Sequence, residues 1–230
     1  MEDCPPAADD GGRAGLGIVN AYRTAGTNRE HPAEPVRGVL IAFEGLDQSG
    51  KQTQAERLGE RLVTAGRVVR PLSFPDYDTV IGSEIGRALR GECCYGPDVM
   101  QLLYVANRYE WKQEIVTSTA QGAVVVCDRY LASSVAYGEA QGLDPAWLVS
   151  MQQHLPQPDV TILLDIPPEA SARRKQTDRD RYEADLALLG RVRESYLRQA
   201  AQGWVRIDAD RDRAAVSEDV WSAVSARLRG

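Results

Sequence analysis

The stretch Val39-Leu-Ile-Ala-Phe-Glu-Gly-Leu-Asp-Gln-Ser-Gly-Lys-Gln-Thr-Gln54 predicts a buried strand, a glycine-rich loop and the start of a helix. Residues 39–43 form a short apolar run of the kind that fills the centre of a parallel sheet. Glycines 45 and 50 let successive backbone N–H groups turn toward one anion. The helix that begins at Lys51 adds the positive end of its dipole. An ordinary glycine turn is the alternative, but a strand before the loop and a helix after it favour a phosphate-binding loop.

We expect this loop to bind nucleotide phosphates through its backbone and its lysine. The predicted phosphate-binding residues are Gly45, Leu46, Asp47, Gln48, Ser49, Gly50, Lys51, Gln52 and Thr53. The P-loop pattern has a Ser or Thr directly after the lysine, which places a hydroxyl on Mg²⁺. Here Gln52 follows Lys51, and Thr53 comes one position later. A protein that binds nucleotides but has lost phosphoryl transfer therefore stays an alternative.

Composition excludes several other classes of protein. A chain of 230 residues fits one α/β domain with a sizeable core. Its net charge of -6 argues against broad electrostatic binding of nucleic acid. No apolar run reaches transmembrane length, and the N-terminus lacks the apolar region of a signal peptide. The four cysteines have no metal-ligand spacing, so we expect free thiols in a reducing cytoplasm.

The rest of the chain alternates strands and helices. Residues 1–36 are rich in Gly, Ala and Pro, which predicts a flexible arm before one folded domain over residues 37–230. After the loop we expect strands at 68–74, 123–128, 160–166 and 204–208, with helices between them and one long helix over 98–120. This order predicts an α/β fold of P-loop NTPase type, with a five-stranded parallel sheet and helices on both faces.

Two features of the later chain complete the predicted site. Asp128 ends an apolar strand, so it lies at the carboxyl edge of the sheet, where ligands bind. There it can hold Mg²⁺ through water, or it can simply cap the next helix. Arg174, Arg179 and Arg181 concentrate positive charge in residues 172–183. This segment is either a mobile lid that closes over the nucleotide or a solvated helix face.

Several motifs, in order along the chain, resemble thymidylate kinase (dTMP kinase), one of the nucleoside monophosphate kinases. The matching segments are Phe43-Glu-Gly-Leu-Asp-Gln-Ser-Gly-Lys51, Phe74-Pro75 with Thr79-Val-Ile-Gly82, Leu102-Leu-Tyr-Val-Ala-Asn-Arg108, Asp128-Arg-Tyr130 with Ser133 and Ala136-Tyr137, Leu155-Pro-Gln-Pro-Asp159, Asp180-Arg-Tyr-Glu183 and Ile207-Asp-Ala209. The resemblance implies phosphoryl transfer from ATP to dTMP, giving dTDP and ADP. It also implies Mg²⁺ as a cofactor, small-molecule nucleotides as partners and a cytoplasmic homodimer.

The resemblance implies an acceptor site of six residues: Asp47, Tyr104, Arg108, Arg129, Ser133 and Tyr137. Arg129 corresponds to the arginine that clamps the dTMP phosphate, and Arg108 to the one that reaches the thymine edge. Tyr104 corresponds to the aromatic residue that stacks on the base, with plain core packing as the alternative. Asp47 corresponds to the loop aspartate that contacts the acceptor sugar and its neighbouring arginine. The bulk of Tyr137 would disfavour a 2′-hydroxyl.

On the donor side the resemblance assigns the ATP β- and γ-phosphates to Lys51 and the loop amides, with Thr53 near the α-phosphate. The family carries its charge-stabilising arginine either in the loop, after the aspartate, or in the lid. Gln48 fills the loop position here, so the role falls to the lid. The predicted catalytic residues are therefore Lys51, Arg129, Arg174, Arg179 and Arg181.

The acceptor side also departs from the family. An arginine usually flanks the Phe-Pro motif and helps to hold the dTMP phosphate, whereas this chain has Ser73 before the motif and Tyr77 after it. One cation is then missing, or it is replaced by Arg70 or Arg87. The remaining alternative is a deoxyribonucleoside kinase, in which Glu44 would act as the base for a 5′-hydroxyl.

Overall fold

Five parallel strands form the centre of the molecule, in the order β2-β3-β1-β4-β5. The computed structural model describes residues 37–174 and 185–228. The strands are β1 (Leu40–Glu44), β2 (Val69–Ser73), β3 (Val124–Asp128), β4 (Val160–Asp165) and β5 (Val205–Asp208). Every neighbouring pair is parallel, which confirms the predicted α/β sheet. The predicted arm of residues 1–36 and residues 175–183 of the predicted lid lie outside the described residues.

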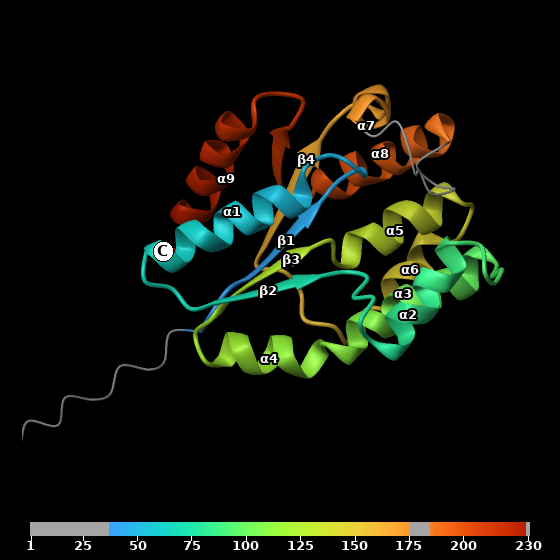
Figure 1. Cartoon of the computed structure of the whole chain (residues 1–230), viewed down its shortest axis with the longest axis horizontal. Coiled ribbons are helices and arrows are strands. Elements are labelled where there is room, and N and C mark those ends of the chain that lie inside the picture. The colour runs from blue at the N-terminus through green and yellow to red at the C-terminus, as the bar shows by residue number, and fades with distance from the viewer. Residues whose placement is uncertain (1–36, 175–184, 229–230) are drawn as a thin grey trace, which may run out of the picture. The chain divides into compact units, whose positions relative to one another are not determined.

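Helices cover both faces of this sheet (Figure 1). They are α1 (Lys51–Thr64), α2 (Val80–Leu89), α3 (Pro97–Glu110), α4 (Lys112–Ala120), α5 (Leu131–Ala140), α6 (Pro145–Ser150), α7 (Pro168–Arg174), α8 (Leu186–Ala200) and α9 (Arg213–Leu228). Helices α1 and α9 lie on one side of the sheet and α4 on the other. Within the described ranges, no helix is both long and apolar enough to cross a membrane.

Strand β1 is buried on both faces, as expected for the centre of a parallel sheet. Successive side chains of a strand point to opposite faces, and the core divides accordingly. Ile41 and Phe43 pack in one cluster with Leu62 of α1, whereas Leu40 packs in another with Ile115 of α4. The two faces therefore hold the strand rigidly, and the loop that follows it starts from a fixed point.

The carboxyl ends of the three central strands meet at one edge of the sheet. In the register, Phe43 of β1 pairs with Asp128 of β3, and Glu44 pairs with Leu163 of β4. The glycine loop leaves β1 at this edge, so Asp128 lies on the strand beside it, as the sequence predicted. Ligands bind at this edge in open α/β sheets.

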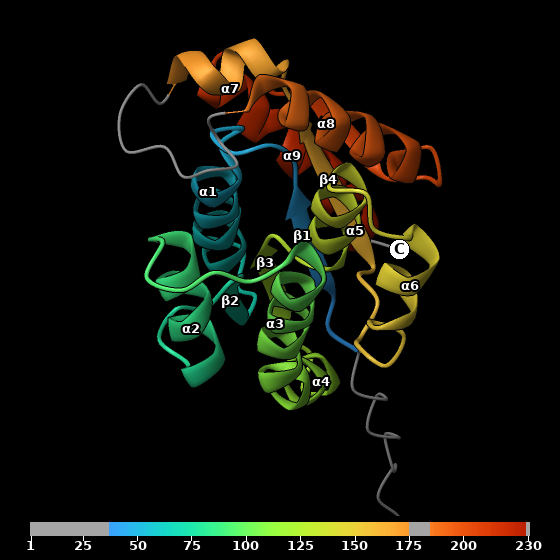
Figure 2. The same cartoon turned by 90° about the vertical axis from the view of Figure 1, so that its right-hand side faces the viewer.

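The single helix predicted over 98–120 is wrong, because the chain bends at Trp111 and forms α3 and α4. Trp111 has φ of -96° and ψ of -3°, and its N–H donates to the Arg108 carbonyl in a tight turn. Its ring packs with Ile115 in the cluster under the sheet. The bend therefore lets α4 cover the sheet while α3 lies between α2 and α5 (Figure 2).

Candidate active site

The glycine loop between β1 and α1 has the geometry of an anion site. Gly45 has φ of 141°, and a Cβ there would lie 2.5 Å from the Leu164 carbonyl oxygen, so only glycine fits. Helix α1 begins at Lys51 with Gly50 as its N-cap and no side-chain cap. The first N–H groups of α1 are thus available to an anion rather than to a capping side chain.

Lys51 lies inside this loop, with only 5% of its surface exposed. Its Nζ donates to the Leu46 carbonyl at 2.7 Å. Burial and the charge of Arg129 lower the pKa of Lys51 to about 8, against the opposing effects of Asp47, Asp128 and Glu44. The lowered pKa means that the nearby negative charges do not offset the cost of burying this ammonium. A bound phosphate would supply the missing negative charge.

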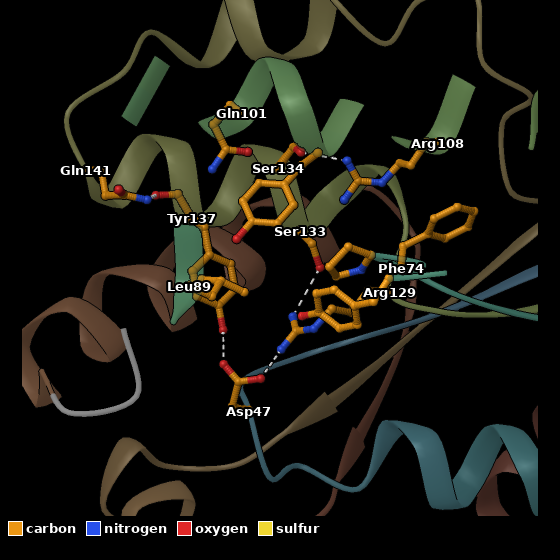
Figure 3. A pocket seen from close by; sticks show the side chains of 13 residues that line it. Asp47, Phe74, Leu89, Gln101, Arg108, Arg129, Ser133, Ser134, Tyr137 and Gln141 are labelled. Atoms are coloured by element: carbon orange, nitrogen blue, oxygen red, sulfur yellow. Dashed lines mark hydrogen bonds and ion pairs between the residues drawn. The ribbon is translucent and has the colours of Figure 1, made fainter. Parts of the chain in front are cut away.

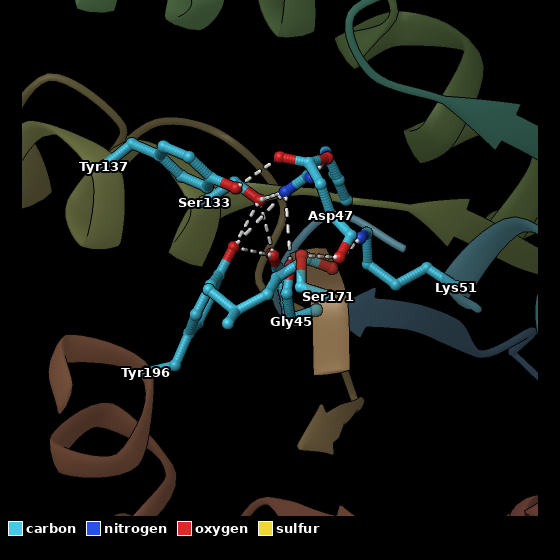
Figure 4. Close-up of polar contacts among 10 residues, drawn as sticks. Gly45, Asp47, Lys51, Ser133, Tyr137, Ser171 and Tyr196 are labelled. Atoms are coloured by element: carbon cyan, nitrogen blue, oxygen red, sulfur yellow. Dashed lines mark hydrogen bonds and ion pairs between the residues drawn. The ribbon is translucent and has the colours of Figure 1, made fainter. Parts of the chain in front are cut away.

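Asp47 joins the loop to the residues that follow β3 (Figure 4). One of its carboxylate oxygens accepts from Arg129 Nη2, and the other accepts from the Tyr137 hydroxyl at 2.8 Å. The guanidinium carbon of Arg129 lies 5.4 Å from the centre of the Tyr137 ring. The backbone carbonyl of Asp47 accepts from Ser171 of α7 at 2.8 Å. Three predicted site residues, Asp47, Arg129 and Tyr137, are therefore in direct contact.

The charges within this group stabilise each other. Burial raises the pKa of Asp47, but Arg129, Lys51 and the Tyr137 hydroxyl outweigh burial and hold that pKa at about 2. Burial works against the charge on Arg129, yet Asp47 keeps its pKa well above the ordinary value. Burial and Asp47 together raise the pKa of Tyr137 well above its usual range. At neutral pH the site therefore holds an ionised aspartate, a permanent guanidinium and a neutral phenol.

Arg129 adopts an uncommon backbone conformation with φ of 62°. Its N–H donates to the Phe43 carbonyl at 2.9 Å, which fixes this turn to the end of β1. Beyond Asp47, its other guanidinium contacts are long, at 3.3 Å to Ser133 and 3.4 Å to the Gly45 carbonyl. The guanidinium thus has donors whose existing bonds are weak and can be exchanged for better acceptors.

Glu44 is the last residue of β1 and is fully buried. Its carboxylate accepts from the Tyr130 N–H at 2.9 Å and from the Ser133 hydroxyl at 2.7 Å. The Tyr196 hydroxyl of α8 lies 3.3 Å from the same carboxylate and 2.9 Å from the Ser133 hydroxyl. A carboxylate that is enclosed and bonded in this way orients Ser133 and the turn after β3. The arrangement does not favour Glu44 as a base for a substrate hydroxyl.

An aromatic pocket opens beside this group, between the Phe-Pro segment, α3 and α5 (Figure 3). Its aromatic lining is Phe74, Tyr77, Tyr104 and Tyr137. Its polar lining is Asp47, Gln101, Arg108, Arg129, Ser133, Ser134 and Gln141. All six residues predicted for the acceptor site therefore line one pocket. Tyr104 also packs against the cluster of Ile85, Ala88 and Met100, which is the core packing considered as its alternative role.

Asn107 of α3 ties the Phe-Pro segment to the pocket. It is fully buried; its carbonyl accepts from the Asp76 N–H at 2.8 Å, and its amide donates to the Asp76 carbonyl at 3.2 Å. The same amide donates to Thr79 Oγ1 at 2.9 Å, and Thr79 caps α2 through the Gly82 N–H. One side chain thus joins α3, the Phe-Pro segment and the start of α2. We call this group the Asn107 anchor.

A groove lies on the other side of the glycine loop from the aromatic pocket. It is lined by Gln48, Ser49, Gly50, Thr53, Gln54, Arg174, Ala209, Arg211, Arg213 and Val216. Arg174 donates to the Gln48 carbonyl at 3.0 Å and to the Ala209 carbonyl at 2.8 Å, and it pairs with Asp210. Of the three predicted lid arginines, Arg174 is thus bonded to backbone at this groove, whereas Arg179 and Arg181 lie outside the described residues.

Asp128 is the described residue that best fits a metal role. Its Oδ1 atom is buried and has no hydrogen-bond partner, and its charge acts on Lys51. Such an oxygen suits Mg²⁺ or one of its waters, because this ion is held by few carboxylates together with substrate phosphates. No cluster of three or more His, Cys, Asp or Glu side chains is found among the described residues. Gln52 is exposed, and its amide donates to Glu56.

The two cations considered as replacements at the Phe-Pro motif do not reach the pocket. Arg70 pairs with Glu114 at 2.9 Å and lies over the Trp111 ring. Arg87 pairs with Glu84 at 2.7 Å on the outer side of α2. Neither residue is among those that line the pocket, whereas Tyr77 is. Arg129 and Arg108 are therefore the described cations of this pocket.

Several residues of the site, Gln101, Ser134 and Tyr196, were not predicted from the sequence. Gln101 precedes Tyr104 by three positions and Arg108 by seven, so helical periodicity could have indicated that they share a face. Ser134 accepts from Arg108 Nη1 at 2.7 Å. Tyr196 comes from α8, far along the chain, and no local pattern marks it.

Comparison with known proteins agrees with this geometry. A family model described as thymidylate kinase matches residues 43–220. The thymidylate kinase of Schizosaccharomyces pombe is 39% identical over 147 residues, which are 64% of this chain and 70% of the relative. That of Plasmodium falciparum is 36% identical over 191 residues, covering 82% of this chain and 90% of the relative. A solved structure of thymidylate kinase from Candida albicans has a TM-score of 0.75 and 29% identity, covering 84% of this chain and 93% of that one.

Proposed function

The chain belongs to the thymidylate kinase family, and on this premise we propose how its residues divide the transfer of a phosphoryl group from ATP to dTMP. The aromatic pocket takes dTMP, and the glycine loop takes the triphosphate of ATP. The observation that carries this proposal is the position of Arg129. It lines the aromatic pocket and contacts Asp47 of the loop, so one guanidinium serves both substrates.

The reaction needs no nucleophile from the protein, because the attacking atom is an oxygen of the dTMP phosphate. The protein must bring two anions into line and neutralise the charge that develops between them. Lys51 and the free N–H groups at the start of α1 hold the β- and γ-phosphates. Arg129 binds the acceptor phosphate through planar paired donors, which match phosphate geometry better than an ammonium does.

Within the aromatic pocket, Tyr104 stacks on the base and Arg108 donates to its edge. Tyr137 closes the sugar side while its hydroxyl is bonded to Asp47. Ser133 keeps the turn in place through Glu44. Tyr77 stands at the pocket where the family usually carries an arginine, so Arg129 binds the acceptor phosphate without that second cation.

The lid arginines divide into two roles in this proposal. Arg174 positions the loop, since its donors are already bonded to the Gln48 and Ala209 carbonyls. Arg179 and Arg181 then remain as the cations that approach the transferring phosphoryl group. Thr53 and the groove beside Arg174 receive the rest of the ATP molecule.

Mg²⁺ is the proposed cofactor, held through Asp128. The buried and unpartnered Oδ1 of Asp128 supports this assignment, whereas Gln52 is exposed and its amide nitrogen donates to Glu56. When bound, Mg²⁺ neutralises charge on the phosphate oxygens. Asp128 itself orients the metal or its waters, and its charge helps to keep Lys51 protonated.

We further propose a cytoplasmic homodimer that binds nucleotides and no nucleic acid. Val80 of α2 is 84% exposed and Leu102 of α3 is 49% exposed, which leaves apolar surface next to the pocket helices. Pairing with a second copy would bury such surface. Among the described residues, Cys93, Cys94 and Cys127 are free thiols, which supports the proposed reducing compartment. Gel filtration with light scattering would report a mass near twice 25.3 kDa, and a monomer at micromolar concentration would reject the dimer.

The experiment that tests the proposed function is a coupled ADP-release assay with ATP, Mg²⁺ and a panel of acceptors. We expect turnover with dTMP and none with thymidine, because Glu44 is buried and bonded rather than placed as a base. Turnover of thymidine alone would favour the deoxyribonucleoside kinase alternative. Binding of ATP without formation of dTDP would favour a regulatory protein.

A further inference from the structure

Two side chains that line the aromatic pocket, Gln101 and Arg108, each have a buried polar atom without a hydrogen-bond partner. Gln101 of α3 is 1% exposed, and its Oε1 carbonyl oxygen accepts no hydrogen bond. An unpaired buried acceptor costs about 1–3 kcal/mol in desolvation. Gln101 also lines the pocket itself. This oxygen is therefore an unsatisfied acceptor in a residue of the pocket wall, where a ligand could supply the missing donor.

The position of this side chain is fixed by packing. Gly138 of α5 faces Gln101, and a Cβ at Gly138 would lie 3.3 Å from Gln101 Cγ and 2.7 Å from the methyl groups of Leu148. Because Gly138 has no side chain, α3 can approach α5 closely, and the stem of Gln101 is held between the two helices. Gln101 shares the pocket face of α3 with Tyr104 and Arg108, three and seven residues later.

The polar groups along this wall have complementary roles. Arg108 is a permanent donor; it donates to Ser134 through Nη1, and its Nε has no partner. Gln101 presents an acceptor on the same wall, on the other side of Ser134 from Arg108 (Figure 3). In Figure 3, Gln101, Ser134 and Arg108 lie along the same side of the pocket. The wall therefore offers both a donor, from Arg108, and an acceptor, from Gln101, to one ligand.

We propose that Gln101 is a specificity-determining residue that accepts a hydrogen bond from the N3–H group of the bound thymine base. This inference rests on the assignment of the aromatic pocket to dTMP. Thymine presents the O4 acceptor beside the N3–H donor, which matches a donor from Arg108 and an acceptor from Gln101. Cytosine presents an amino donor and an unprotonated N3 at the same places, so both contacts would be lost. Gln101 thus contributes to the choice of a thymine or uracil base over cytosine.

The test compares Gln101 with a second glutamine whose side-chain oxygen is also buried and without a hydrogen-bond partner. Gln152 is also buried, at 3% exposed, and its Oε1 is likewise unpartnered, but it lies outside the aromatic pocket. Gln101→Met and Gln152→Met remove the same amide from two places and preserve most of the side-chain volume. We expect Gln101→Met to raise the KM for dTMP about three- to tenfold, the effect of one neutral hydrogen bond, with kcat within about twofold of the wild type. Gln152→Met should leave KM unchanged.

A modified substrate checks the contact directly. N3-methyl-dTMP cannot donate at N3, so the wild type should prefer dTMP in calorimetric titrations, and Gln101→Met should lose about three- to tenfold of that preference. Gln101→Glu keeps an acceptor at the same reach and should retain the preference. Equal rises in KM for both methionine variants, or an unchanged preference in Gln101→Met, would overturn the proposal. Wild-type protein that fails to bind dTMP would instead reject the pocket assignment itself.

Discussion

Two carboxylates at the same edge of the sheet, Asp165 and Asp47, both pair with arginines. They differ in how strongly the arginine donors are already bonded. Asp165 ends β4, is 6% exposed, and accepts paired bonds from Arg193 at 2.7 and 3.1 Å and from Arg206 at 3.1 and 2.6 Å. Asp47 in the loop pairs with Arg129, whose other contacts are 3.3 Å or longer. Four bonds of 2.6 to 3.1 Å thus occupy the Asp165 carboxylate, and we call Asp165, Arg193 and Arg206 the saturated group. The group of Asp47 and Arg129 keeps donors that a ligand can use.

The backbone conformation also differs between Arg129, the partner of Asp47, and Asp165. Arg129 has φ of 62°, an uncommon conformation for a residue other than glycine, whereas Asp165 is the last residue of a regular strand. Burial raises the pKa of Asp165, but Arg193 and Arg206 outweigh burial and leave that pKa below its usual value, so this carboxylate too is ionised at neutral pH. Charge pairing alone therefore does not identify an active site. A charged group that lines a pocket and keeps unused donors is the better indicator.

The largest expected effect comes from Lys51→Met, which removes the loop cation and keeps its apolar stem. We expect kcat to fall by about 1,000-fold or more, in line with the loss of a charged group that acts on the transition state. Stability to urea should not fall, because burial disfavours the charged form of this lysine and lowers its pKa to about 8. Steady-state kinetics and urea unfolding at pH 7 measure the two effects. Activity near that of the wild type would reject the phosphate role of Lys51.

Arg129→Lys should have the next largest effect, because it keeps the charge but loses the planar pair of donors. We expect kcat/KM for dTMP to fall about 100-fold, equal to about 2.7 kcal/mol. The matched change in the saturated group, Arg206→Lys, should leave kcat/KM within about twofold. Similar losses for both variants, measured in the coupled assay, would remove the distinction between the two groups.

The pH dependence gives a smaller and graded effect. Lys51 must be protonated to bind phosphate, and its pKa in the free protein is lowered to about 8. We expect kcat/KM for ATP to fall toward tenfold per pH unit above pH 8, and Lys51→Arg, although slower, to show no such decline up to pH 9.5. The contribution of Lys51 to stability has the opposite pH dependence. Between pH 8 and 10.5 the unfolded state binds more protons than the folded state, so the free energy of unfolding rises with pH. A flat profile for the wild type would contradict the shift.

The smallest effect on activity should come from Arg193→Ala, which opens the saturated group. Loss of its two bonds to Asp165 should lower the free energy of unfolding by about 1–3 kcal/mol while kcat/KM stays within about twofold. Urea unfolding and the coupled assay on the same preparation separate the two readouts. A tenfold loss of kcat/KM without a loss of stability would show that Asp165 takes part in the reaction.

Much of the fold could be predicted because local patterns determine it. The apolar run of β1, the glycine loop and the start of α1 are adjacent in sequence, and Asp128 follows from a strand that ends in a carboxylate. The bend at Trp111 could not be predicted in this way. It contains no proline or glycine, and the apolar residues of α3 and α4 read as one continuous helical pattern. Packing of Trp111 under the sheet decides the bend.

The site shows the same division. Asp47, Arg129 and Tyr137 were found because their motifs could be matched one by one, and the structure brings them together. The contact of Tyr196 with Ser133, and the bonds of Arg174 to the Gln48 carbonyl, depend on segments that are distant in sequence. Which donors remain available is a property of three-dimensional packing, and a linear pattern does not contain it.

The Asn107 anchor has a consequence for inhibitor design. Because Asn107 binds both the N–H and the carbonyl of Asp76 and also the cap of α2, the Phe-Pro wall cannot move outward without α3. A compound that needs a wider pocket would have to shift two helices as one block, against the core that Ile85 and Met100 form between them. Rigid compounds shaped to the existing width are therefore better starting points than bulky ones. Additional volume belongs near Tyr77, a lining residue that is 50% exposed.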